Sequence, residues 1–143
     1  MKKYIAAGFF SVLTFGAYAG EAIIPYWHMY STETPCISIS NVSNKAVNFK
    51  VTLYNQDSSK YTGDLQFAKN IAMLDQDTLL PARGTAKFCL QKTASEFFGH
   101  GVIKTSEIDE AGGKSFVIAH SRQVHVAGGY HSSAVPINGG LPF

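Results

Sequence analysis

Hydrophobic and polar residues alternate most clearly between positions 36 and 54. Two alternating runs, at 36–42 and 47–54, flank the polar tetrapeptide Ser43-Asn44-Lys45-Ala46. Alternation at period two places the apolar side chains on one face, as expected for a half-buried β-strand. Short polar residues between two such runs favour a tight turn. The pattern therefore predicts two strands that pair as a β-hairpin.

Similar strand-like runs continue along the chain, at 21–30, 85–90, 102–106, 115–126 and 130–137. Turn signals such as Pro81-Ala82-Arg83-Gly84 and Gly128-Gly129 separate them. Segment 93–98 is compatible with one helical turn that Gly99-His100-Gly101 ends, and 61–77 is expected to form a short insertion over one end of the sheet. Strands at this spacing with few helices predict an all-β fold, a single antiparallel β-sandwich of the immunoglobulin-like kind.

The first nineteen residues have the pattern of a secretory signal peptide. Lys2 and Lys3 give a positive start, residues 5–15 are apolar, and Ala17-Tyr18-Ala19 is a small-x-small cleavage site. The apolar run is too short to span a bilayer, and no later run approaches the length of a membrane span. We therefore expect export from a bacterial cell, to the periplasm or the exterior, with 20–143 as one mature domain.

Cleavage changes the charge balance of the chain. The full sequence has 12 Lys and Arg against 10 Asp and Glu, and loss of Lys2 and Lys3 leaves ten of each sign. The formal net charge of +2 therefore belongs to the signal peptide. Nucleic-acid binding needs clustered Lys and Arg, so a nucleic-acid partner is not expected.

Two cysteines, Cys36 and Cys89, both fall on the polar phase of a strand-like run. A lone buried cysteine is expected on the apolar phase. Two outward cysteines in an exported protein favour a cross-strand disulfide between them. Two unpaired thiols and an intermolecular bridge remain the alternatives.

An aromatic stretch that includes Tyr26, Trp27 and Tyr30 follows the signal peptide and contains the single tryptophan. An exposed aromatic platform for a sugar or a partner is one interpretation, because rigid aromatic rings suit recognition. A first strand with Trp27 in the core is the other, and it is the one that we favour.

The strand predicted at 115–126 contains the most notable polar pair. Phe116, Ile118, Val124 and Val126 share one phase, which we expect to face the core, and His120 and Arg122 fall on the same phase. Because a buried guanidinium needs a partner, two roles are open. The pair lines a ligand pocket in which Arg122 holds a carboxylate or phosphate, or it forms a structural network with Glu33, Glu107 or Asp109.

Other candidate chemistry is weak. His120 and His125 are five residues apart, so on a regular strand they face opposite sides. A metal site from His100, His125 and His131 is conceivable, but no metal or cofactor is expected. Gly112-Gly113-Lys114-Ser115 lacks the upstream glycine of a P-loop, because Ile108 occupies that position. With no serine nucleophile elbow either, an enzyme is not expected.

Three stretches resemble the small β-sandwich family of sensory rhodopsin transducers: Thr34-Pro35-Cys36-Ile37 with Val51-Thr52-Leu53-Tyr54, Leu80-Pro81-Ala82-Arg83-Gly84-Thr85, and Val117-Ile118-Ala119-His120-Ser121-Arg122. The family carries a similar Pro-Ala-Arg-x-Thr turn and a similar His-Thr-Arg near the end of its last long strand. The resemblance spans about 35–125 and implies a transducer-like sandwich as the alternative to an immunoglobulin-like one. It implies a fold, and fold alone does not carry function.

These observations lead to an expectation of a non-catalytic binding or interaction module of the bacterial envelope or exterior. Its partner would be an envelope or extracellular protein or a glycan, and a homo-oligomer is possible. The alternative is a small-ligand or carbohydrate-binding domain that uses Trp27, His120 and Arg122.

Export with cleavage predicts a mature chain that begins at Gly20. Intact-mass measurement of the protein recovered outside the cytoplasm checks this, and the expected mass is that of residues 20–143 with one disulfide. Recovery of exported protein that retains Met1 would contradict the cleavage site.

Overall fold

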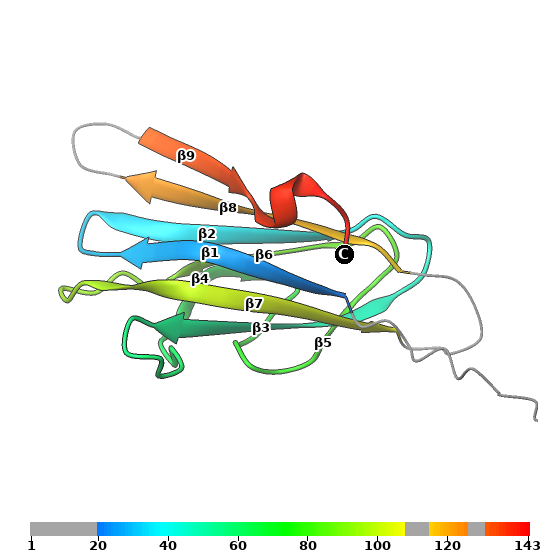
Figure 1. Ribbon diagram of the computed structural model, residues 1–143, viewed down its shortest axis with the longest axis horizontal. Coiled ribbons are helices and arrows are strands. Elements are labelled where there is room, and N and C mark those ends of the chain that lie inside the picture. The colour runs from blue at the N-terminus through cyan, green and yellow to red at the C-terminus, as the bar shows by residue number, and fades with distance from the viewer. Residues whose placement is uncertain (1–19, 108–114, 126–130) are drawn as a thin grey trace, which may run out of the picture.

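The computed structural model describes residues 20–107, 115–125 and 131–143, and within them the chain forms two antiparallel sheets packed face to face (Figure 1). The first sheet has four strands in the order β1-β7-β3-β5, and the second has five in the order β4-β6-β2-β8-β9. The predicted all-β sandwich is confirmed. The elements are β1 (Glu21–Met29), β2 (Glu33–Asn41), β3 (Val47–Asn55), β4 (Leu65–Lys69), β5 (Thr78–Leu80), β6 (Thr85–Leu90), β7 (Phe97–Glu107), β8 (Val117–His125), β9 (His131–Pro136) and the 3-10 helix η1 (Ile137–Gly140).

Every connection from β1 to β8 carries the chain from one sheet to the other, and only β8 and β9 are consecutive and paired. The predicted hairpin at 36–54 is therefore wrong. β2 and β3 are both strands, as the alternation indicated, but β2 pairs with β6 and β8 while β3 pairs with β5 and β7. The order also differs from the immunoglobulin arrangement, in which several consecutive strands share a sheet.

Asn41 explains why the turn after β2 crosses between sheets. Its side chain is buried, and its amide nitrogen donates to the backbone carbonyls of Lys45, Leu80 and Pro81. Its carbonyl oxygen accepts from the backbone N–H of Ser43. These bonds tie the turn to the segment after β5 in the opposite sheet. The polar tetrapeptide is thus a turn, but one fixed by contacts distant in sequence.

The core lies between the sheets and is made from the inward phase of each strand. Ile37 and Ile39 of β2 and Phe49 and Val51 of β3 are at most 1% exposed. Trp27 is fully buried with them, and its indole N–H donates to the carbonyl of His100 at 2.9 Å. The expectation that Trp27 belongs to the core is confirmed, and the exposed-platform interpretation of this residue is wrong.

The face of β8 that points to the core is the opposite of the one expected. Val117, Ala119 and Ser121 face the core, while His120 and Arg122 lie on the exposed face. Small inward residues suit this strand because η1 and β1 pack against it. The outward phase carries Ile118 and Val124 only partly buried, so apolar periodicity alone pointed to the wrong face.

Segment 61–77 is part of the sandwich, and its description as an insertion is wrong. It supplies β4, an edge strand of the five-stranded sheet. It also places Tyr61 and Ile71 in the core, each 7% exposed. The Asp and Asn residues that interrupted the apolar pattern lie in its exposed turns, where Asn70 and Asp75 adopt positive φ.

β7 begins earlier than expected, and the predicted helical turn at 93–98 is not formed. Gly99 and Gly101, expected to break the chain, lie within this central strand. A Cβ on Gly99 would stand 1.8 Å from the carbonyl oxygen of Tyr54 on β3. Glycine therefore permits the close approach of β7 to β3 at this point.

Cys36 and Cys89 form the expected intramolecular disulfide. They are directly opposite on β2 and β6, their side chains lie on the outward face, and no free cysteine remains among the described residues. Among those same residues, no helix has the length and apolar character needed to cross a membrane.

Removal of the disulfide should lower stability without changing the fold. The bond closes a loop of 53 positions. In the chain-entropy treatment such a loop stabilises the folded state by up to about 4 kcal/mol. We expect the Cys36→Ser, Cys89→Ser variant to lose about 2–4 kcal/mol of unfolding free energy in urea. Titration of the denatured, unreduced wild type should find no thiol, and two thiols would contradict the bridge.

Candidate functional site

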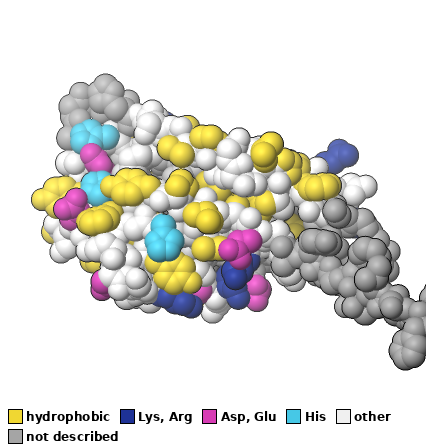
Figure 2. Space-filling view, viewed as in Figure 1, with side chains coloured by type: hydrophobic (Ala, Val, Ile, Leu, Met, Phe, Trp, Pro, Cys, Tyr) yellow, Lys and Arg dark blue, Asp and Glu magenta, His cyan; other side chains and the backbone are white. Residues whose placement is uncertain are grey.

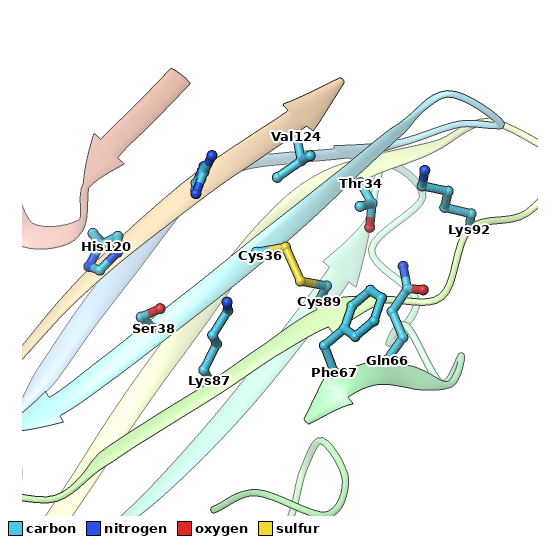
Figure 3. A pocket seen from close by; sticks show the side chains of 11 residues that line it. Thr34, Cys36, Ser38, Gln66, Phe67, Lys87, Cys89, Lys92, His120 and Val124 are labelled. Carbon is cyan, nitrogen blue, oxygen red and sulfur yellow. A yellow bond between two sulfur atoms is a disulfide. The ribbon is translucent and has the colours of Figure 1, made fainter. Parts of the chain in front are cut away.

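The outward face of the five-stranded sheet holds a cavity of about 520 Å³ centred on the disulfide (Figure 3). We call it the outer-face pocket. Side chains from four neighbouring strands line it because β4, β6, β2 and β8 are adjacent in the sheet. Its principal lining residues are Phe67, Lys87, Lys92, His120, Arg122 and the Cys36–Cys89 bridge.

Strand register explains how residues distant in sequence meet here. Cys36 is directly opposite both Cys89 on β6 and Arg122 on β8. One step along the strands, Ser38 is directly opposite Lys87 and His120 in the same way. Directly opposite residues share a face at about 5 Å between Cβ atoms. The disulfide covalently joins the two central strands of this array.

The polar groups at the other end of the pocket converge on one backbone atom. Thr34 Oγ1 and Gln66 Nε2 each donate to the carbonyl oxygen of Leu90 at 2.6 Å. Thr34 is buried and Gln66 partly so. The two bonds hold both side chains in place beside Lys92, which Figure 3 shows at the same end.

The pocket is cationic and lacks a compensating carboxylate. Within the described part of the chain, Lys87, Lys92 and Arg122 form no ion pair or hydrogen bond, and no acidic side chain lines the cavity. Lys69 on β4 is also directly opposite Lys87. Like charges in opposite positions destabilise a sheet. The fold thus holds positive charge on this face without an internal partner.

On the four-stranded sheet, by contrast, the basic side chains lie beside carboxylates. Lys50 lies near Asp77, Lys60 pairs with Asp75, and Lys104 Nζ lies 3.2 Å from a carboxylate oxygen of Glu21. Figure 2 views the molecule from this side and shows basic side chains next to acidic ones. Hydrogen bonds from Lys60 and Thr52 lower the pKa of the Asp75 carboxyl and, in turn, the Asp75 carboxylate raises the pKa of Lys60. Charge is therefore balanced on the four-stranded sheet but not around the pocket.

Phe67 is the most exposed large apolar residue at the pocket. Its side chain is 74% exposed, and its backbone has φ of 53°. A bulky residue in the left-handed region is unusual and costs about 1–3 kcal/mol. It lies at the register shift between Gln66 and Lys69 on β4. Neither burial nor backbone preference accounts for a phenyl ring at this position.

Of the candidate residues from the sequence, His120 and Arg122 lie together in the pocket, and Trp27 does not. The structural network proposed for Arg122 is not formed with Glu33, whose carboxylate contacts His28 and His125 instead, and the side chain of Glu107 lies outside the described residues. Asp109, the third candidate, lies outside the described residues. The pair is exposed rather than buried, so it needs no internal counter-charge.

Sequence reasoning missed Phe67, Lys87 and Lys92. Phe67 lay in the segment taken for an insertion, and Lys87 and Lys92 occupied ordinary polar positions on and after β6. One signal was available: Lys87 and Cys89 share the polar phase of one strand. A predicted disulfide on that phase already implied that Lys87 would lie beside the bridge.

A second polar cluster lies at the end of the sandwich where β1 meets β2. Both ring nitrogens of His28 contact carboxylates, Nδ1 to Glu33 at 2.8 Å and Nε2 to Glu96 at 3.0 Å. The other oxygen of Glu33 lies 2.8 Å from Nδ1 of His125. Hydrogen bonds from His28 and then His125 lower the pKa of Glu33 below its ordinary value of 4.5. The cluster connects β1, β2, β8 and the segment before β7.

The conceivable metal site from three histidines is not assembled. His100 stacks on Tyr54 with ring centroids 5.2 Å apart on the four-stranded sheet, far in the topology from His125 on β8. The side chain of His131 lies outside the described residues. No group of three or more potential ligand side chains suited to a metal ion occurs in the described part of the chain.

Comparison with known proteins gives no relative: no protein-family model matches the chain, and no curated protein or solved structure matches it either. The resemblance to the sensory rhodopsin transducers therefore stays a prediction.

The Glu33 cluster predicts a specific pH dependence of stability. A carboxyl whose pKa is lower in the folded state stabilises the fold above its unfolded pKa, and this contribution disappears as the pH falls through the folded value. We expect Glu33→Gln to lower Tm at pH 6 and to approach the wild type as the pH falls below about 4.

Thermal unfolding between pH 6 and pH 3 measures this, with Glu21→Gln as the control because it removes the same charge from the far end of β1, where Glu21 contacts Lys104 and no residue of the cluster. A Tm difference between Glu33→Gln and wild type that stays constant over this range would rule out the cluster as the source of the dependence.

Proposed function

We propose that this protein is an exported, non-catalytic binding module of the bacterial envelope or exterior, and that it holds an anionic ligand in the outer-face pocket. The observation that carries the proposal is the group of cations, Lys87, Lys92 and Arg122, which have no counter-charge among the residues that the structure describes. Positive groups without a protein partner attract an anion from solution, and cations that line one hollow together reinforce that attraction.

The disulfide supports the exported part of this proposal. Structural disulfides persist in the periplasm and outside the cell and are rare in the bacterial cytoplasm. The bridge joins β2 and β6 beneath the pocket, so the oxidised compartment would also be the one in which the site is fully braced. The signal-like sequence at 1–19 points to the same compartments.

Binding without catalysis agrees with the groups in the pocket. Ser38 and His120 are directly opposite on β2 and β8, but no hydrogen bond joins them among the described contacts. A nucleophilic serine requires a base within hydrogen-bond reach and a third group that orients the base. Among the residues that the structure describes, no carboxylate lines the cavity to orient His120.

The cavity size favours a small ligand, or one unit of a larger one, over a flat protein surface. Small-molecule sites are typically about 300–1,000 Å³, with apolar walls and a few convergent polar groups. The outer-face pocket has this size and this mixture. This favours the small-ligand or carbohydrate-binding alternative, with Phe67 in the aromatic role first considered for Trp27. A protein partner that bound to this face would contact the same three cations, Lys87, Lys92 and Arg122.

Removal of the pocket cations should abolish binding to a polyanion. The mature chain carries ten basic and ten acidic residues, so retention on dextran sulfate resin requires a local positive field. We expect the wild type to be retained at 50 mM salt or below, and Lys87→Gln with Arg122→Gln to flow through. Because both side chains are exposed, the variant should keep its unfolding free energy within about 0.5 kcal/mol of wild type.

Lys50→Gln with Lys104→Gln is the matched control, because it makes the same change in net charge on the four-stranded sheet. This control should remain on the resin. Wild-type protein that flows through at low salt, or equal loss of retention in both double variants, would contradict the proposal.

A further inference from the structure

The hydrogen-bonding groups of the outer-face pocket are divided between its two ends. Lys87 and Arg122, near His120 and Ser38, can only donate. At the end formed by Thr34 and Gln66, the Thr34 hydroxyl and one N–H of the Gln66 amide donate to the carbonyl of Leu90, and the second N–H of Gln66 remains available. The lone pairs of Thr34 Oγ1 and the Oε1 atom of Gln66 are left as acceptors. Since a carbonyl only accepts, the Gln66 amide must direct its NH₂ group to Leu90.

The oxygen acceptors at the end formed by Thr34 and Gln66 restrict which uncharged groups of a ligand can lie there. An acceptor pair is satisfied by a hydroxyl, an amide N–H or an ammonium group. Lys92 lies at the same end and would repel an ammonium group (Figure 3). A bare inorganic anion could meet Lys92 at this end, but it would leave the oxygen acceptors of Thr34 and Gln66 without a donor. The ligand that satisfies both ends carries negative charge together with neutral donors.

Phe67 adds an apolar requirement. In Figure 3 its ring stands between the two ends, next to the disulfide, and it is 74% exposed. Holding a phenyl ring in solvent at φ of 53° is unfavourable in the free protein. Strain of this kind clusters at ligand-binding positions, where the surrounding structure imposes it. An apolar ring face on the ligand would cover this side chain.

We propose that the ligand of the outer-face pocket is an acidic saccharide, a sugar ring that carries a carboxylate or sulfate. Its anionic group lies between Arg122 and Lys87, its hydroxyls donate to Thr34 and Gln66, and its C–H face stacks on Phe67. A carboxylate matches the planar fork of Arg122 in a bidentate manner. This inference rests on the proposed anion-binding function and specifies the class of anion.

Isothermal titration of the oxidised mature protein with three probes tests it. Trigalacturonic acid has sugar rings and three carboxylates, maltotriose has the rings without charge, and tricarballylate has three carboxylates without a sugar. We expect trigalacturonic acid to bind at least about tenfold more tightly than either of the others. A sulfated trisaccharide in a fourth titration distinguishes a carboxylate preference from a sulfate preference.

Each failure has a separate meaning. If tricarballylate binds as tightly as trigalacturonic acid, the saccharide inference is overturned and the anion-binding function stands. If maltotriose equals trigalacturonic acid, or if no charged probe binds, both the inference and the proposed function are overturned.

Phe67→Ala tests the stacking role with a readout that a structural role would not give. We expect it to weaken trigalacturonic acid at least about tenfold, to leave tricarballylate unchanged, and to leave Tm unchanged or raised. Phe98→Ala, an exposed aromatic on β7 of the other sheet, is the control and should alter neither affinity. If Phe67→Ala binds trigalacturonic acid as tightly as the wild type, the inference is overturned. It is also overturned if the variant has a lower Tm and loses affinity equally for trigalacturonic acid and tricarballylate.

Discussion

Burial of one phase of every strand between the two sheets is the constraint on which the rest of this structure depends. Residues such as Ile37, Phe49 and Phe88 are almost fully removed from water, and burial of each large side chain contributes about 1.5–3 kcal/mol. Because the chain changes sheet at every connection from β1 to β8, neighbours in a sheet are distant in sequence. The core therefore decides which outward side chains become neighbours. The outer-face pocket is a product of that arrangement.

The two sheets differ in how their basic side chains are paired, although the net charge does not reveal this difference. Residues 20–143 contain equal numbers of basic and acidic residues, yet among the described residues the cations of the four-stranded sheet lie beside carboxylates and those around the pocket do not. Exposed ion pairs contribute little to stability, so the difference matters more for recognition than for folding. The disulfide lies beneath the pocket cations and joins β2 to β6, the strand that carries Lys87, while Arg122 lies on β8 at the other side of β2. The bridge and the pairing of β2 with β8 together hold Lys87 and Arg122 on one face of the sheet.

The strands could be predicted from sequence because alternation depends only on the period of the backbone. β6 was predicted with its observed bounds, and the disulfide followed from the polar phase of Cys36 and Cys89. Pairing could not be predicted, because the turn at Asn41 is decided by the carbonyls of Leu80 and Pro81 on another element. The face of β8 was misjudged because both phases of that strand carry apolar residues. His120 and Arg122 line the same pocket, as their shared phase on one strand indicated, but Phe67 and Lys87 join them only through sheet register.

The most direct test of the account is an NMR titration of ¹⁵N- and ¹³C-labelled, oxidised mature protein with trigalacturonic acid. The account predicts shifts concentrated on the outward face of the five-stranded sheet, including the Arg122 Nε–H, the Gln66 side-chain amide and the Phe67 ring. It predicts no change around Tyr54 and Lys104 on the opposite face of the molecule. Shifts centred on the four-stranded sheet, or none at saturating ligand, would contradict it.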